Sequence, residues 1–172
     1  ITDFGAMTGL SWGDLDGDGW VDLFVCNYLN GMPGTSTVRN RVWRNNGDGT
    51  FTDIAAQLGL SYGAYSFIAA LFDADLDGDL DIYLSNDRAM FSPFIPNRFY
   101  RNDGGVFTDI GAQNGTQLVF FSMGVACGDM DGNGLPDLYC TNLSSNTPPM
   151  MGACPLLLQQ PGGQFVQQQQ QW

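Results

Sequence analysis

Three stretches of the sequence carry aspartate at nearly every second position. Residues 14–22 (DLDGDGWVD), 73–81 (DADLDGDLD) and 129–137 (DMDGNGLPD) all fit the pattern D-x-D-x-[DN]-G-x-x-D. A backbone that curls around one point would bring positions 1, 3, 5 and 9 together, and the glycine at position 6 permits the sharp bend. Because every donor in such a ring is a hard oxygen, the pattern favours Ca²⁺ over Mg²⁺ and over softer metals.

We call these stretches acidic loops 1, 2 and 3. We expect each loop to hold one Ca²⁺ through the side chains at positions 1, 3, 5 and 9 and through the backbone carbonyl at position 7. The predicted ligands are Asp14, Asp16, Asp18, Trp20 and Asp22; Asp73, Asp75, Asp77, Asp79 and Asp81; and Asp129, Asp131, Asn133, Leu135 and Asp137. Asn133 replaces an acid, so we expect the third site to be the weakest. An EF-hand would need an acid at position 12, which the loops lack.

The loops concentrate the negative charge of the chain. They hold four, five and three of its 18 acidic residues, and the formal net charge is −12. Carboxylates crowded within a few ångströms repel one another unless a cation neutralises them, so we expect bound calcium to stabilise the fold. Sites of this kind suit the millimolar calcium found outside cells, which predicts a secreted or cell-surface protein.

The loops recur within a longer repeat. The stretch 40–54 (NRVWRNNGDGTFTDI) returns as 97–110 (NRFYRNDGGVFTDI), and a worn third copy begins near Pro155. We therefore treat the chain as one array of three approximate repeats, 1–60, 61–116 and 117–172. Short apolar runs before and after each loop, with two more runs joined by a glycine-rich turn, predict four antiparallel strands per repeat. This is the pattern of a β-propeller blade, and the predicted fold class is all-β.

The composition excludes several kinds of function. The chain contains no His, Lys or Glu, so a Ser-His-Asp triad, an imidazole metal site and a lysine Schiff base are all ruled out. The strongly negative charge argues against nucleic acid as a partner. No apolar run approaches the roughly 18 residues of a transmembrane helix, so we expect no membrane insertion.

The acidic loops and the stretch 44–60 (RNNGDGTFTDIAAQLGL) resemble the FG-GAP and VCBS repeat families, and especially the repeats of ASPIC/UnbV-type extracellular proteins. The resemblance implies a β-propeller scaffold with calcium at the three loops, in a setting like that of the integrin α head. Such propellers commonly have about seven blades, whereas this chain has three repeats. Three blades cannot close a ring, so closure requires further repeats or other copies of the chain.

We therefore expect a non-enzymatic extracellular scaffold that assembles with copies of itself, as in a fibre, or with further repeats of a longer chain. A ligand-binding adhesion head, with glycans or extracellular proteins as partners, is an alternative; its contacts would come from residues 29–37, 88–96 and 143–153. A glycan-cleaving enzyme that uses aspartates is a weaker alternative. Asp87 beside Arg88 is the notable charged pair outside the repeat.

Two further features suggest covalent modification. Asn114 and Asn142 begin N-glycosylation sequons, which predicts a glycoprotein if they are used. The four cysteines allow three disulfide connectivities. Cys140 with Cys154, or Cys127 with Cys140, would bridge the ends of a loop, and buried free thiols are the alternative.

Overall fold

The computed structural model describes residues 5–28, 38–87, 95–143 and 154–168. These residues form twelve strands and one short helix, and the strands make three four-stranded antiparallel sheets. In each sheet the strands lie side by side in the order in which they follow along the chain. The expectation of an all-β chain with four antiparallel strands per repeat is confirmed.

We call the sheets blades 1, 2 and 3. Blade 1 contains β1 (Ala6–Gly13), β2 (Asp22–Tyr28), β3 (Arg41–Asn45) and β4 (Phe51–Asp53). Blade 2 contains β5 (Ser66–Phe72), β6 (Asp81–Asn86), β7 (Arg98–Asn102) and β8 (Phe107–Asp109). Blade 3 contains β9 (Ser122–Gly128), β10 (Asp137–Asn142), β11 (Leu156–Gln160) and β12 (Gln164–Gln168).

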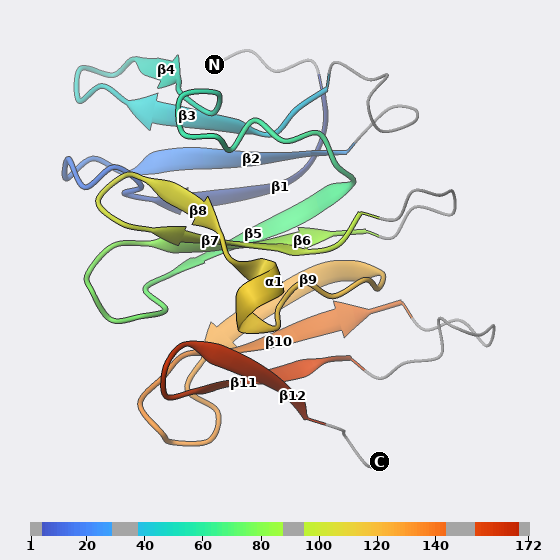
Figure 1. Ribbon diagram of the computed structural model, residues 1–172. Coiled ribbons are helices and arrows are strands. Elements are labelled where there is room, and N and C mark those ends of the chain that lie inside the picture. The colour runs from blue at the N-terminus through green and yellow to red at the C-terminus, as the bar shows by residue number, and fades with distance from the viewer. Residues whose placement is uncertain (1–4, 29–37, 88–94, 144–153, 169–172) are drawn as a thin grey trace.

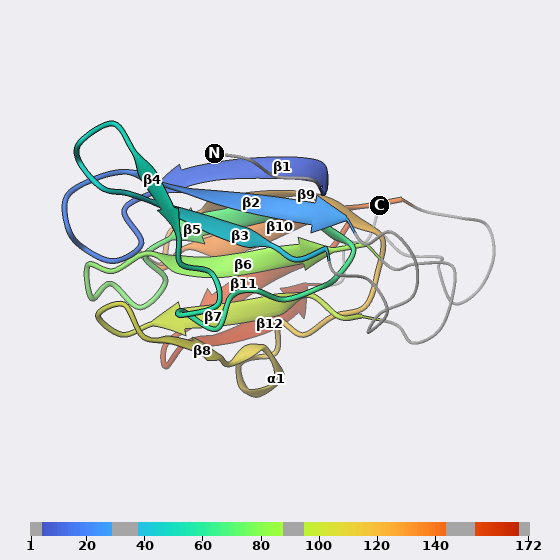
Figure 2. The same cartoon turned by 90° about the horizontal axis from the view of Figure 1, so that it is seen from above.

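The blades are stacked in an open row with blade 2 in the middle (Figure 1). Strand β1 lies against β5, and β5 lies against β9. The acidic loops join the first and second strands of the three blades, and all three lie along the same side of the stack (Figures 1 and 2). The stack is not closed into a ring, as expected for three propeller-type blades.

Small residues allow the first strands of neighbouring blades to approach closely. A Cβ atom at Gly9 would lie 2.1 Å from the carbonyl oxygen of Phe67, and the hydroxyl of Ser11 donates a hydrogen bond of 2.5 Å to the carbonyl of Ala69. Backbone therefore contacts backbone along this side of the stack, where a larger side chain at Gly9 would force the blades apart.

Two hydrophobic clusters fill the space between the blades, and we call these regions junction 1 (blades 1 and 2) and junction 2 (blades 2 and 3). Both faces of β2 and β6 are buried, as the apolar runs predicted, whereas in β10 Tyr139 is half-buried and Thr141 is exposed. In β2, Phe24 and Cys26 belong to junction 1, and in β6 alternate residues point to opposite junctions: Ile82 to junction 1 and Tyr83 to junction 2. The middle blade therefore contributes to both cores.

The helix α1 (Gly111–Asn114) follows β8 and was not expected from the sequence. It ends at Gly115, whose φ of 85° lies in the left-handed region that suits glycine at a helix end. A Cβ atom at Gly115 would lie 2.7 Å from the carbonyl oxygen of Phe165. Glycine at this position therefore lets the end of α1 lie directly on β12 of blade 3.

Blade 1 presents an uncovered apolar face at its end of the stack. Leu10 and Trp12 on β1 are 54% and 57% exposed. The corresponding residues of blade 2 are Ala69, which is buried at junction 1, and Leu71, which packs against that junction. The outer face of blade 1 thus corresponds to the face of blade 2 that packs against blade 1, but on blade 1 this face is exposed.

The only helix in the described part of the chain, α1, is far too short to span a membrane.

Candidate metal centres

Each acidic loop gathers three carboxylates. One oxygen from each member of a group lies within 4.8 Å of the others. The groups are Asp14, Asp16 and Asp18; Asp73, Asp75 and Asp81; and Asp129, Asp131 and Asp137. Positions 1 and 3 take part in all three loops, whereas the third member comes from position 5 in loop 1 and from position 9 in loops 2 and 3. For the other predicted ligands of each loop, a role in calcium binding remains a prediction.

The first aspartate of each loop organises the backbone around itself. In loop 1, one oxygen of Asp14 accepts hydrogen bonds from the N–H groups of Gly17 and Asp18, and the other accepts one from Gly19 at 2.9 Å. Asp129 accepts the same three bonds in loop 3, and Asp73 accepts those from Asp77 and Gly78 in loop 2. These bonds curl the chain, so the loop geometry is encoded by the first aspartate itself.

The last aspartate of each loop is a buried clamp. Asp22 accepts one hydrogen bond from the N–H of Leu15 (3.0 Å) within its loop and another from the N–H of Asn45 (2.9 Å) at the end of β3. The same two bonds recur in the other blades, from Ala74 and Asn102 to Asp81 and from Met130 and Gln159 to Asp137. Position 9 therefore fastens each loop to the third strand of its blade, a role that the sequence pattern did not reveal.

Two positions of each loop adopt a left-handed backbone, although the spacing pointed to one. At position 6 the expected glycine is present, with φ of 88° at Gly19, 101° at Gly78 and 85° at Gly134. Position 4 is also left-handed and holds glycine in loops 1 and 3 but Leu76 in loop 2, with φ of 64°. A leucine in this region is strained, so loop 2 carries a conformational cost that the other loops avoid.

In loops 2 and 3 a side chain at position 7 or 5 hydrogen-bonds to a neighbouring segment of the same blade. The Asp79 carboxylate accepts a hydrogen bond of 2.7 Å from the N–H of Gly104, in the turn between β7 and β8. In loop 3 the contact comes from position 5, where the amide of Asn133 donates to the carbonyl of Gln159. An aspartate could not make this bond, which gives a structural reason for the asparagine in loop 3.

Burial changes the acidity of these carboxyl groups in the absence of a cation. Desolvation raises the pKa of Asp81 to about 6, although the hydrogen bonds from Asn102 and Ala74 oppose the shift. Desolvation likewise raises the pKa of Asp22 and that of Asp75, and Asp77 adds like-charge repulsion at Asp75. A nearby cation would remove this penalty because it favours the ionised form.

The donor sets fit calcium. Every group consists of carboxylate oxygens, and the chain has no histidine that would favour a softer metal. A cation bound there would neutralise three converging carboxylates and join residues that are up to eight positions apart in the chain. Its chemistry would be electrostatic cross-linking of the loop, which stabilises the folded state.

The glycosylation prediction fails at one of its two positions. Asn114 is 3% exposed, and its side-chain oxygen accepts hydrogen bonds from both the N–H and the hydroxyl of Thr116. A glycan cannot be attached there without unfolding the surroundings of α1, so this prediction is wrong for the folded chain. Asn142 is half-buried and accepts a bond from the N–H of Phe121, and Ser144 of its sequon lies outside the described residues.

None of the cysteines forms a disulfide; all four lie among the described residues as free thiols. Cys140 points into the core of junction 2, beside the hydroxyl of Tyr83. Burial raises the pKa of the Cys140 thiol to about 12. The sulfur of Cys154 instead accepts a hydrogen bond from the N–H of Asn142. The suggested pairings of Cys140 with Cys154 or with Cys127 are therefore absent. The alternative of buried free thiols holds for Cys26 and Cys140, whereas Cys127 is exposed and Cys154 is half-buried.

The other charged position singled out in the sequence is also structural. Asp87 is 8% exposed and accepts a hydrogen bond of 2.9 Å from the hydroxyl of Tyr28. Arg88 lies outside the described residues, as do 29–37, 89–94 and 144–153 of the variable segments.

Comparison with known families gives an independent match. A family model described as FG-GAP-like repeat matches the chain twice, at residues 14–84 and 73–140. Each match begins at the first aspartate of an acidic loop, and together they span more than two thirds of the chain. No curated protein matches the chain.

Proposed function

This chain belongs to the FG-GAP-like repeat family, and from that premise we propose that it is a calcium-stabilised, non-enzymatic scaffold module that works outside the cell. The observation that carries the proposal is the recurrence of one carboxylate cluster in the same loop of all three blades. A feature repeated in every blade serves what the blades have in common, which is their folding and stacking.

Calcium would be held at positions 1 and 3 of each loop with a third carboxylate from position 5 or 9. At calcium concentrations near 100 times Kd, each occupied site would add about 2.7 kcal/mol to the free energy of unfolding. That contribution is large beside a typical total of about 5–15 kcal/mol, so the fold would depend on the ion. Such dependence suits the steady millimolar calcium outside cells.

The proposal includes assembly through the ends of the stack. Leu10 and Trp12 are exposed on blade 1. They occupy the same places on β1 as Ala69 and Leu71 on β5, which face blade 1 at junction 1. At the other end, Tyr139 of blade 3 is half-buried, whereas its counterpart in blade 2, Tyr83, is fully buried by blade 3. Blade 1 of one copy can therefore cover blade 3 of another, and such head-to-tail contacts give a fibre unless they close.

Light scattering and negative-stain imaging in calcium test this proposal. The wild-type chain should form particles that grow with protein concentration, and L10D and W12D should remain monomeric while melting at the wild-type temperature. Val106 is 64% exposed in the turn between β7 and β8, so V106D is the matched control and should assemble normally. A wild-type chain that stays a monodisperse monomer would contradict assembly.

A further inference from the structure

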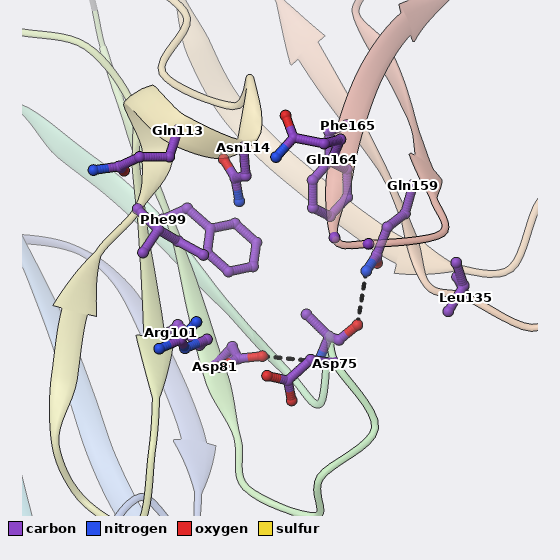
Figure 3. Close-up of a pocket in the computed structure, with 14 residues that line it drawn as sticks. Asp75, Asp81, Phe99, Arg101, Gln113, Asn114, Leu135, Gln159, Gln164 and Phe165 are labelled. Atoms are coloured by element: carbon purple, nitrogen blue, oxygen red, sulfur yellow. Dashed lines mark hydrogen bonds between the residues drawn. The ribbon is translucent and has the colours of Figure 1, made fainter.

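A cavity of about 570 Å³ opens at junction 2 beside acidic loop 2 (Figure 3). Its walls come from both blades and from the end of α1, and they include Phe99, Phe165, Asn114 and Gln159. Cavities of this size hold small ligands in other proteins. Here the size follows from particular residues that differ between junction 1 and junction 2.

Three leucines of junction 1 are replaced at junction 2. Leu15 and Ala74 are equivalent, because each donates its N–H to the last aspartate of its loop. Leu58 and Leu60 occupy the places of Asn114 and Thr116, since the two segments make the same backbone hydrogen bonds to the residues before them. Leu15 and Leu60 are almost fully buried and Leu58 packs against them. Junction 2 therefore loses apolar volume and gains polar groups where junction 1 is filled.

Two of the polar groups at junction 2 are left without a partner. Gln159 is 2% exposed; its amide nitrogen donates to the carbonyl of Ala74 at 2.8 Å, and its side-chain oxygen has no hydrogen bond. Asn114 is 3% exposed, and its side-chain nitrogen also has no partner. Leaving a buried polar group unpaired is unfavourable, so these two amides provide an acceptor and a donor that a molecule in the cavity can satisfy.

The other residues that line the cavity determine which class of ligand it can bind. Phe99 and Phe165, with ring centroids 5.6 Å apart, form the apolar side. Asp75 and Arg101 stand opposite, near loop 2 (Figure 3). An anionic ligand would be repelled by loop 2, and a purely apolar ligand would leave both amides unpaired. An uncharged molecule with hydroxyl groups on a carbon ring satisfies both the donors and acceptors and the apolar side.

We propose that the cavity at junction 2 binds one sugar residue of a glycan. Its hydroxyl groups pair with the amides of Gln159 and Asn114 and with Asp75 and Arg101, and its C–H face lies against the phenylalanines. This function goes beyond calcium binding and assembly, because it resides at the described junction where the repeat is broken, although the site shares Asp75 with the carboxylate group of loop 2.

Saturation-transfer NMR and calorimetry in calcium test the proposal with methyl glycosides of glucose, galactose, mannose and N-acetylglucosamine as probes. At least one probe should bind the wild-type chain. A74L restores the leucine of junction 1 and should weaken that binding by at least about tenfold, since it fills the cavity. A56L adds the same volume at an exposed position and is the matched control, with unchanged binding.

N114L gives a second reading that does not depend on A74L folding. It removes the unpaired donor and introduces leucine, the residue that junction 1 has at this place (Leu58). It should also weaken binding of the same probe. The proposal is overturned if none of the probes binds the wild-type chain, or if the probe that binds does so equally well in A74L and N114L.

Discussion

Junction 1 and junction 2 are built on the same backbone frame and are filled differently. In both, the last aspartate of the loop accepts an N–H from position 2 of the loop and an N–H from the end of the third strand. Leu15 then fills junction 1, where it is fully buried, whereas Ala74 stands at the wall of the cavity in junction 2. The frame is conserved between the blades while the filling is not.

This difference separates two kinds of residue. The aspartates and glycines of the loops recur because every blade uses them to shape its loop, and under the proposed function they would also hold a cation. Residues that depart from the repeat, such as Ala74 and Asn114, do not serve the common frame, and their departure leaves polar groups unpaired. Natural sequences usually break local consistency at functional positions, so the broken repeat is where a specific function is expected.

The largest predicted effect comes from opening junction 1. L15A removes a fully buried side chain and should lower the free energy of unfolding by about 3–5 kcal/mol, measured by urea denaturation in calcium. Leu135 is half-buried at the wall of the cavity, so L135A is the matched change at junction 2 and should cost less than about 1.5 kcal/mol. Equal costs would mean that the two junctions are equally well filled.

The next effect separates the clamp from the cation ligands. D22A leaves the N–H groups of Leu15 and Asn45 without acceptors and should cost about 2–4 kcal/mol even in calcium-free buffer. Asp16 is more exposed and belongs to the carboxylate group of loop 1, so D16A should lose stability in calcium but not without it. If D16A and D22A respond alike to calcium removal, the clamp has no role of its own.

A pH effect should follow from the buried carboxyl groups. A raised pKa means that the folded calcium-free chain binds a proton more tightly than the unfolded chain, so its stability falls as pH rises from about 4 through 6. The melting temperature in calcium-free buffer should therefore be lower at pH 7 than at pH 5. Because the pKa of Asp81 is raised to about 6, D81N should flatten this dependence; a melting temperature that rises from pH 5 to pH 7 would contradict the assignment.

The smallest effect concerns the strained residue of loop 2. L76G should raise the free energy of unfolding by up to about 1 kcal/mol, because glycine tolerates the left-handed backbone but loses more conformational freedom on folding. The reverse change in loop 3, G132L, should cost about 1–2 kcal/mol. Urea denaturation of both variants checks the pair, and a destabilising L76G would show that the leucine side chain contributes more than its strain costs.

Much of this architecture could be predicted from the sequence, since its signals are local. The apolar runs, the glycine turns and the spacing of the aspartates indicate strands and loops through short-range geometry alone. The clamp role of Asp22, the left-handed backbone at Leu76 and the helix α1 were missed. Each of them depends on contacts or dihedral angles that the spacing of residue types does not encode.

The candidate sites divide in the same way. The carboxylate groups follow from the repeated pattern, whereas the burial of Asn114 and the free thiol of Cys140 depend on how blades 2 and 3 pack. Sequence motifs suggested a glycan on one and a disulfide on the other, and tertiary packing overrode both. The replacement of Leu15 by Ala74 could be read from an alignment of the repeats, but the cavity it leaves could not.

Calcium binding at the loops is the central claim, and its stoichiometry is the most direct test. Native mass spectrometry of the wild-type chain, after exhaustive removal of metal and titration with calcium, should show three ions per chain, with the triple variant D14A/D73A/D129A binding none. A wild-type chain that takes up no calcium at millimolar concentration, and whose melting temperature does not change when calcium is removed, would contradict the account.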